Sequence, residues 1–143
     1  MTLQPYPPPN HPRPTILLVE DEPFVRDATC GILQHAGFEV LPAIDAPDAM
    51  TIYQASHRPI ALVMTDMVLP GRSGLQLGHD LRQLSPEVVL LVTSGYTNPE
   101  YEVEAPESRT YFLAKPYSRR TLLDKIEIIL RPSSLAQPAK QAG

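Results

Sequence analysis

The chain of 143 residues contains a single cysteine, Cys30. One cysteine cannot form an intramolecular disulfide, and by itself it cannot build a structural zinc site. No apolar run approaches the roughly 18 residues that a membrane span needs. The N-terminus also lacks the basic region and apolar core of a secretion signal. We therefore expect a cytoplasmic protein that does not associate with membranes.

The chain also has no excess of positive charge. Twelve Lys and Arg residues stand against 16 Asp and Glu residues, which gives a formal net charge of −4. This balance argues against non-specific binding to nucleic acid. Hydrophobic residues make up 43% of the chain and charged residues 20%, as is ordinary for a globular protein. The length predicts one domain with a real core.

Proline is the residue in excess, with 17 copies in the chain. Six of them fall within residues 1–14, where almost nothing can be buried, so we predict a flexible, extended leader there. The proline spacing also fits a PxxP ligand, which is the alternative interpretation. Residues 132–143 are predicted to form a flexible tail. The folded domain is expected between these ends, at residues 15–131.

Between the two ends, short apolar runs alternate with helical patterns. Strands are predicted at residues 15–19, 38–41, 60–65, 88–92 and 111–114, and helices at 23–36, after the cap Asp45, at 74–84 and after the cap Ser118 to about 130. At most one short helix is predicted in the acidic segment 97–109. Such alternation predicts a doubly wound α/β fold with a five-stranded parallel sheet and helices on both faces. We expect the flavodoxin-like strand order 2-1-3-4-5.

Apolar residues at helical spacing predict which side of each helix faces the sheet. They are Val25, Ala28, Ile32 and Ala36 in the first helix, Ala49, Ile52 and Tyr53 in the second, Leu77, Leu81 and Leu84 in the third, and Leu122, Leu123, Ile126 and Ile129 in the last.

Polar side chains follow four of the five predicted strands. Because parallel strands end at one edge of the sheet, these side chains should meet there, beside the topological switch point between the first and third strands. They are Glu20 and Asp21 after the first strand, Asp66 after the third, Thr93 and Ser94 after the fourth, and Lys115 after the fifth. The sequence therefore predicts a crevice with three carboxylates, a hydroxyl group and an ammonium group.

This combination favours one kind of chemistry. Two carboxylates about 4 Å apart repel each other by ~4 kcal/mol at an effective dielectric constant near 20, so the cluster needs a raised pKa or a bound cation. Oxygen ligands suit Mg²⁺. A Mg²⁺ ion held by Asp21 and Asp66 would leave one Asp66 oxygen free as a nucleophile. Lys115 and a Ser or Thr hydroxyl could bind phosphoryl oxygens. We deduce the formation and hydrolysis of an aspartyl phosphate.

These motifs, taken in order, resemble those of the receiver domain of two-component response regulators, over residues 15–131. The matching residues are Glu20-Asp21, Asp66 with Pro70 and Gly74 after it, Ser94-Gly95 and Lys115-Pro116. The resemblance implies that Asp66 is the phosphoacceptor and that Lys115 contacts the phosphoryl group. It also implies that Mg²⁺ is bound by Asp21 and Asp66 directly, by the backbone carbonyl of Val68, and by Glu20 through water.

The resemblance further implies a conformational switch and a cis bond between Lys115 and Pro116. The switch hydroxyl is Ser94 or Thr93, and we prefer Ser94 because Gly95 after it leaves room for a phosphoryl group. The switch aromatic falls on Phe112, three residues before the lysine.

The function that the resemblance implies is that of a single-domain response regulator without an output domain. A histidine kinase or histidine phosphotransfer protein would phosphorylate Asp66. The phosphoryl group would then change protein contacts on a face formed by segment 97–109, the last strand and the last helix. Such a chain is a signalling domain that catalyses only its own phosphorylation and dephosphorylation. We expect a monomer or a phosphorylation-dependent dimer, with no nucleic-acid or membrane partner and an unknown downstream target.

Other interpretations remain open at this point. A phosphohydrolase of the haloacid-dehalogenase type would need a second aspartate two residues after the nucleophile, where this chain has Val68. A degenerate receiver could serve as a docking module that never carries phosphate. Asp21 could also be a simple helix cap before Pro23.

Overall fold

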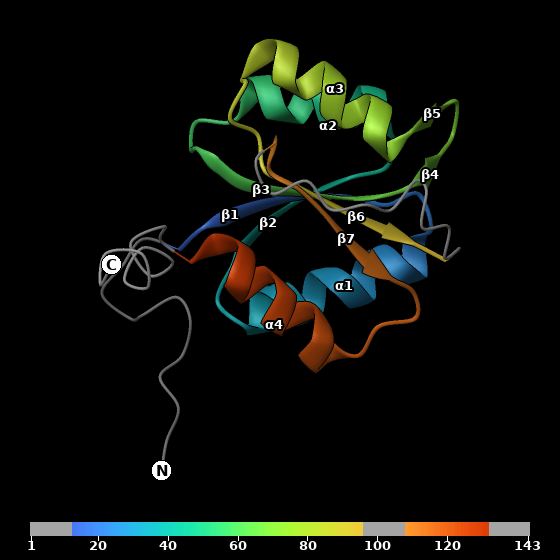
Figure 1. The fold of residues 1–143 in the computed structure, drawn as a ribbon, viewed down its shortest axis with the longest axis vertical. Coiled ribbons are helices and arrows are strands. Elements are labelled where there is room, and N and C mark those ends of the chain that lie inside the picture. The colour runs from blue at the N-terminus through green and yellow to red at the C-terminus, as the bar shows by residue number, and fades with distance from the viewer. Residues whose placement is uncertain (1–12, 96–107, 132–143) are drawn as a thin grey trace, which may run out of the picture.

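The computed structural model describes residues 13–95 and 108–131, so the predictions for residues 1–12, 97–107 and 132–143 lie outside the described residues. In chain order the elements are β1 (Thr15–Val19), α1 (Pro23–His35), β2 (Glu39–Ala43), α2 (Ala46–Ala55), β3 (Ile60–Asp66), β4 (Val68–Leu69), β5 (Arg72–Ser73), α3 (Gly74–Leu84), β6 (Leu90–Ser94), β7 (Thr110–Ala114) and α4 (Arg119–Leu130) (Figure 1).

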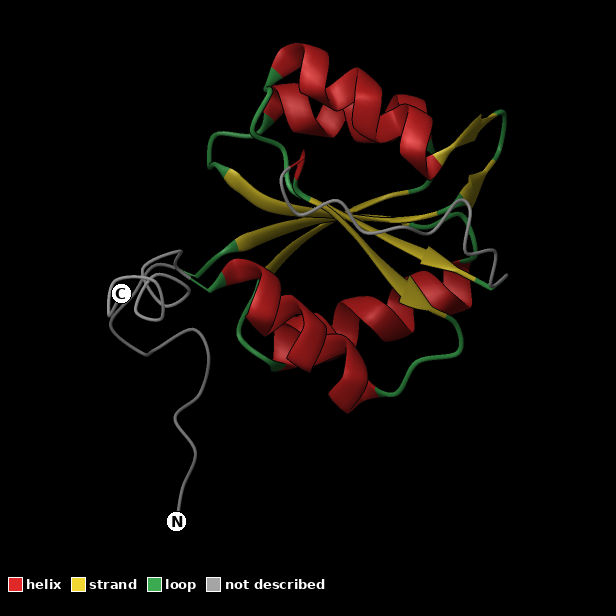
Figure 2. Cartoon of the chain, in the orientation of Figure 1, coloured by secondary structure: helices red, strands yellow, loops and turns green. Residues whose placement is uncertain are grey.

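Five of the strands form one parallel sheet, in the order β2-β1-β3-β6-β7 (Figure 2). This confirms the predicted fold class and strand order. β1 lies between β2 and β3, and all five of its residues are buried. A strand with helices over both faces reads as a continuous apolar run, which is why Thr15–Val19 was recognisable in the sequence.

The two faces of the sheet carry separate apolar clusters. α2 and α3 cover one face, and α1 and α4 cover the other (Figure 1). Side chains alternate between the faces, as a strand requires. Leu17 and Val19 of β1 belong to the cluster under α2 and α3, and Ile16 and Leu18 belong to the cluster under α1 and α4.

Local caps define where the helices begin and end. The side chains of Asp45 and Ser118 accept hydrogen bonds from Asp48 N and Thr121 N, which confirms both predicted caps. Ser73 and Gln76 form a reciprocal capping box at the start of α3. α1 ends before Gly37, whose φ of 106° belongs to the left-handed region that glycine tolerates.

Four strands differ from their predicted bounds, β3 and β7 by one residue and β2 and β6 by more. β2 extends to Ala43 and includes Pro42, because β2 is an edge strand and a proline there need not break a ladder hydrogen bond. β6 begins at Leu90 rather than Val88, since Val88 N donates to Ser85 O in a turn. An apolar run alone does not reveal that its first residues belong to a turn.

Two helix faces also differ from the prediction. In α1 the buried residues are Thr29 and Leu33, and Ala28 is exposed. In α3 Leu77 and Leu81 are buried, but Leu84 is 46% exposed because it is the last residue of the helix. The stripe predicted for α4 is confirmed, with Leu122 and Ile126 fully buried and Leu123 and Ile129 packed against them.

The burial pattern of α4 provides a matched pair of core and surface variants. Ile126 is 0% exposed and Ile128 is 64% exposed. We expect Ile126→Ala to lower the free energy of unfolding by about 2–5 kcal/mol, because a cavity remains among the residues it touches. Ile128→Ala should change it by no more than about 0.5 kcal/mol. Urea denaturation of both variants tests this, and equal losses would contradict the assigned face.

Candidate functional site

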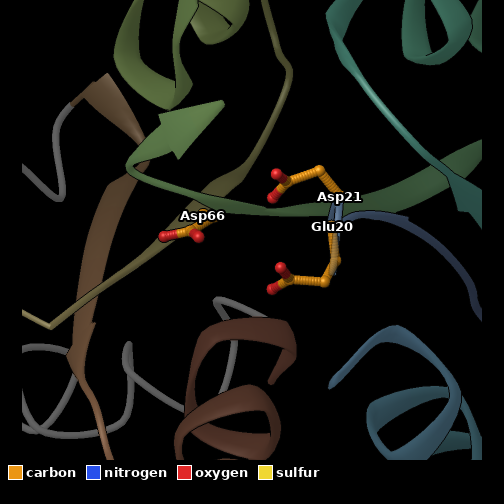
Figure 3. Close-up of side chains that lie close together, drawn as sticks. All are labelled: Glu20, Asp21 and Asp66. Atoms are coloured by element: carbon orange, nitrogen blue, oxygen red, sulfur yellow. The ribbon is translucent and has the colours of Figure 1, made fainter. Parts of the chain in front are cut away.

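Three carboxylates meet at the carboxyl edge of the sheet. Glu20 and Asp21 directly follow β1, and Asp66 is the last residue of the neighbouring β3. Figure 3 shows the carboxylates of Glu20 and Asp21 both turned toward Asp66. One oxygen from each residue lies within 4.8 Å of the others. The predicted cluster of carboxylates is therefore present, and adjacent strands create it.

Lys115 brings a positive charge to this cluster from the end of β7. Its Nζ lies 3.2 Å from Asp66 Oδ2 and 3.7 Å from Glu20 Oε1. Its backbone N–H donates to Ser94 O at 2.8 Å, which fixes the lysine beside the end of β6. The bond between Lys115 and Pro116 is cis, as the resemblance implied.

Burial and charge set the pKa values of the two most enclosed ionisable groups. Glu20 is 5% exposed, and its burial raises the pKa of its carboxyl group. Repulsion by Asp66 and Asp21 adds to that rise, while the Glu22 N–H and Lys115 oppose it. Burial alone would lower the pKa of Lys115, but attraction by Asp66 and Glu20 outweighs it and raises that pKa. Glu20 therefore lies where a further cation would stabilise its charged form.

Backbone contacts hold Glu20 in this place. Its N–H donates to Ala43 O at 3.0 Å, and its Oε2 accepts from Glu22 N at 3.2 Å. Arg26 of α1 donates from Nη1 to the Glu20 carbonyl at 2.9 Å. Sequence reasoning missed this arginine. The available signal was a cation in the first turns of a helix that begins beside two acidic residues.

The start of α1 also tests the alternative interpretation of Asp21 as a simple helix cap. The helix cap is Glu22, whose side chain accepts from Phe24 N, and not Asp21. Asp21 is exposed and lies with the other two carboxylates. The simple-cap interpretation of Asp21 was therefore wrong.

A small hairpin follows Asp66 and positions its backbone. β4 and β5 pair antiparallel, with Val68 opposite Ser73, around Gly71 at φ 73°. Met67 N donates to Thr93 O at 2.8 Å, and Met67 O accepts from Gly74 N at 2.7 Å. The hairpin was not predicted, because strands of two residues leave no periodic pattern. Val68, whose carbonyl is a predicted metal ligand, is 63% exposed on it.

Gly74 is the point where the start of α3 packs against the Asp66 segment. A Cβ atom at this residue would overlap the Asp66 carbonyl and would lie 2.9 Å from Cγ2 of Thr65. Both obstacles belong to the strand end itself. Gly74 therefore allows α3 to approach the loop that carries the acidic residue.

The candidate switch residues lie on β6, which pairs with β3, and on β7. Ser94 and Thr93 are 4% and 2% exposed and end β6 instead of following it. Thr93 Oγ1 points to the carbonyl of Thr65 at 3.5 Å. Phe112 pairs in register with Val92, two residues before Ser94, and packs against the cluster under α2 and α3. The switching roles of Ser94 and Phe112 remain predictions.

The donor set fits a hard divalent cation. All three side chains are carboxylates, their oxygens lie within 4.8 Å of one another, and burial raises the pKa of Glu20. Lys115 supplies one positive charge against three carboxylates. Oxygen ligands of this kind, open on the side of Asp21, match the preferences of Mg²⁺.

Comparison with known proteins places the chain in a family. The sequence-family model of the response regulator receiver domain matches residues 16–127. The chain belongs to the receiver domain family. Receiver domains are phosphoacceptor signalling modules rather than true enzymes, and they interact with histidine kinases. In the part of this receiver that the structure describes, no helix is long and apolar enough to cross a membrane.

Individual relatives agree with this assignment. The sensory transduction protein RegX3 of Mycolicibacterium smegmatis is 32% identical over 117 residues, covering 82% of this chain and 50% of RegX3. This receiver thus spans about half the length of that relative. Among solved structures, chemotaxis protein CheY4 of Vibrio cholerae matches with a TM-score of 0.76 at 26% identity, covering 83% of this chain and 100% of CheY4.

A further structure, of TrrA from Thermotoga maritima in complex with Mg(2+)-BeF, matches with a TM-score of 0.71 at 23% identity. It covers 82% of this chain and 99% of TrrA. At this identity the likeness concerns the fold alone.

The packing at Gly74 generates a prediction about the site. We expect Gly74→Ala to lower the free energy of unfolding by about 1–3 kcal/mol, because the added methyl group overlaps the Asp66 carbonyl. Gly31→Ala is the matched control: Gly31 lies inside α1 with open space around it, so alanine should stabilise the chain by up to about 1 kcal/mol. Urea denaturation measures both. If both variants raised the free energy of unfolding by the same amount, the close approach of Gly74 to the Asp66 carbonyl would be disproved.

Proposed function

We propose that this receiver accepts a phosphoryl group on Asp66 from a histidine kinase or a histidine phosphotransfer protein. The observation that carries the proposal is the contact of Lys115 Nζ with Asp66 Oδ2 at 3.2 Å, beside two further carboxylates. A nucleophilic carboxylate, a cation for phosphoryl oxygens and a potential metal site thus share one crevice. An aspartate that was merely exposed in a turn would not need a lysine and two further carboxylates beside it.

The proposed phosphoryl transfer is a displacement reaction at phosphorus. One Asp66 oxygen attacks the phosphorus atom of phosphohistidine, the P–N bond breaks, and the imidazole leaves as the neutral ring, which keeps the proton already on its other nitrogen. Lys115 stays charged at neutral pH, since the pKa of its ammonium group is raised, and pairs with a phosphoryl oxygen. Ser94 donates to another oxygen in this scheme. Hydrolysis by water later returns Asp66 to its carboxylate form.

Asp21, Asp66 and the Val68 carbonyl would hold Mg²⁺, with Glu20 bound through water. When bound, the ion neutralises charge on the carboxylates and on the incoming phosphoryl group. Asp21 is exposed and Glu20 is buried. The exposed carboxylate of Asp21 is therefore suited to bind the ion directly, and the buried carboxylate of Glu20 is suited to bind it through water. The Glu20 carboxylate keeps its place through the Glu22 N–H.

The output of the proposed switch is a change in protein contacts. Ser94 and Phe112 lie on strands β6 and β7, which are paired through their whole length. Their rearrangement would alter the proposed output face around β7 and α4; Ile128 of α4 is exposed. Coupling of about 1–3 kcal/mol is typical and is enough to change the affinity for a partner. We place the switch in a domain at residues 15–131 of a cytoplasmic protein that is a monomer or dimerises on phosphorylation.

Phosphorylation can be tested without knowing the kinase. Wild-type protein incubated with acetyl phosphate and Mg²⁺ should gain the mass of one phosphoryl group, because the Asp66 side chain is partly exposed and a small acyl phosphate can reach it. Asp66→Asn should gain none. Asp27→Asn, which removes an exposed carboxylate of α1, is the control and should behave as wild type. Intact mass spectrometry is the measurement.

An unmodified wild type, or equal addition to Asp66→Asn, would exclude Asp66 as phosphoacceptor. Unchanged partner binding by Asp66→Asn would instead favour the docking module that never carries phosphate.

Metal binding has a readout that does not depend on phosphorylation. A ligand that binds only the folded state at about 100 times its Kd raises the free energy of unfolding by about 2.7 kcal/mol. We expect saturating Mg²⁺ to stabilise the wild type by this order. Asp21→Asn should lose most of that gain, whereas Asp124→Asn, at an exposed position of α4, should keep it. Thermal unfolding with Mg²⁺ and with EDTA decides the point, and equal gains in both variants would contradict the ligand set.

A further inference from the structure

The loop from Lys115 to Tyr117 must hold the ammonium group in place without regular secondary structure of its own. It connects the end of β7 to Ser118, the cap of α4. On one side, Lys115 N is fixed to Ser94 O. On the other, Ser118 Oγ accepts from Thr121 N at 3.0 Å. Between these anchors, Tyr117 faces α1.

The contact between Tyr117 and α1 is a hydroxyl pair. Tyr117 Oη lies 3.3 Å from Oγ1 of Thr29, a residue 88 positions away in the sequence. Thr29 is 4% exposed, and the Tyr117 ring packs against the apolar cluster under α1 and α4. Thr29, Lys115, Pro116 and Tyr117 line one groove between helix and loop, so the two elements face each other there.

The presence of a polar hydroxyl group at the buried residue Thr29 calls for a physical explanation. Thr29 lies on the buried side of α1 together with Leu33, where valine would fill nearly the same volume without a polar atom. A buried hydroxyl group is costly unless it has a hydrogen-bond partner. Tyr117 supplies that partner, and phenylalanine in its place would not.

α1 is attached to the acidic side of the crevice as well. Arg26, three residues before Thr29, donates to the Glu20 carbonyl at 2.9 Å. The helix therefore contacts the backbone that carries Glu20 and also the loop that carries Lys115. Lys115 Nζ in turn lies within 3.7 Å of both Glu20 and Asp66.

We propose that Tyr117 is a positioning residue for Lys115, because its hydroxyl ties the Lys115–Tyr117 loop to Thr29 of α1. The tie keeps the ammonium group directed at Asp66. This inference rests on the proposed function, in which Lys115 pairs with the phosphoryl group. It adds Tyr117 and Thr29 to the residues on which the rate of phosphoryl transfer depends.

The test removes the hydroxyl groups and leaves the shapes in place. We expect Tyr117→Phe and Thr29→Val each to slow phosphorylation by acetyl phosphate about three- to tenfold, the effect that one neutral hydrogen bond allows. The double variant should be no slower than either single variant, since both remove the same bond. Thr29→Ser keeps a hydroxyl group and should retain most of the wild-type rate. Tyr111→Phe is the control, because Tyr111 packs against the same apolar cluster but lies on β7, and it should leave the rate unchanged.

A second background separates positioning from a general loss of structure. In Lys115→Met the residual rate should not fall further when Tyr117→Phe is added, because the tie acts through the ammonium group. The affinity for Mg²⁺, measured by the unfolding assay, should stay the same in Tyr117→Phe.

Three results would overturn the proposal. They are a wild-type rate in Tyr117→Phe, an equal loss from Tyr117→Phe in the wild type and in Lys115→Met, or a full loss in Thr29→Ser. A wild type that takes up no phosphoryl group at all would instead overturn the proposed function, so the two failures are distinguishable.

Discussion

The candidate site depends on the attraction between Lys115 and a group of carboxylates that would otherwise repel one another. Glu20, Asp21 and Asp66 have oxygens within 4.8 Å of one another, and Lys115 contacts two of them. One ammonium group leaves a surplus of negative charge at a partly buried position. That surplus makes the crevice suited to a divalent cation and, with it, to a phosphoryl group. The proposed binding of Mg²⁺ and of a phosphoryl group rests on this excess of carboxylates over ammonium groups.

The sheet order creates this charge cluster, and local contacts make it specific. β1 and β3 are neighbours, so the residues at their ends meet. The position of Asp66 then depends on the hairpin after it and on the missing side chain of Gly74. The loop of Lys115 depends on contacts with β6 and α1. The reactive groups thus lie on strand ends, and neighbouring backbone holds them.

Much of this was legible in the sequence because the signals are local. Buried parallel strands are continuous apolar runs, and polar residues after them must share an edge, so Glu20, Asp66 and Lys115 could be brought together without a structure. Features that depend on contacts distant in sequence were missed. The buried face of α1 includes Thr29 instead of Ala28, and the Thr29 hydroxyl group pairs with Tyr117, 88 residues away in the sequence. The start of β6 was misplaced for a local reason, because Val88 N donates to Ser85 O in a turn that an apolar run does not reveal.

The central claim is that the Asp66 carboxylate, and no other group, becomes an acyl phosphate. Borohydride reduces an acyl phosphate of aspartate to homoserine, which marks the position of the modified residue. The phosphorylated chain should be reduced and digested, and the peptide that contains residue 66 should be sequenced by mass spectrometry. The account predicts homoserine at residue 66. Homoserine at Asp21, or an unreduced residue 66 in a chain that carries phosphate, would contradict it.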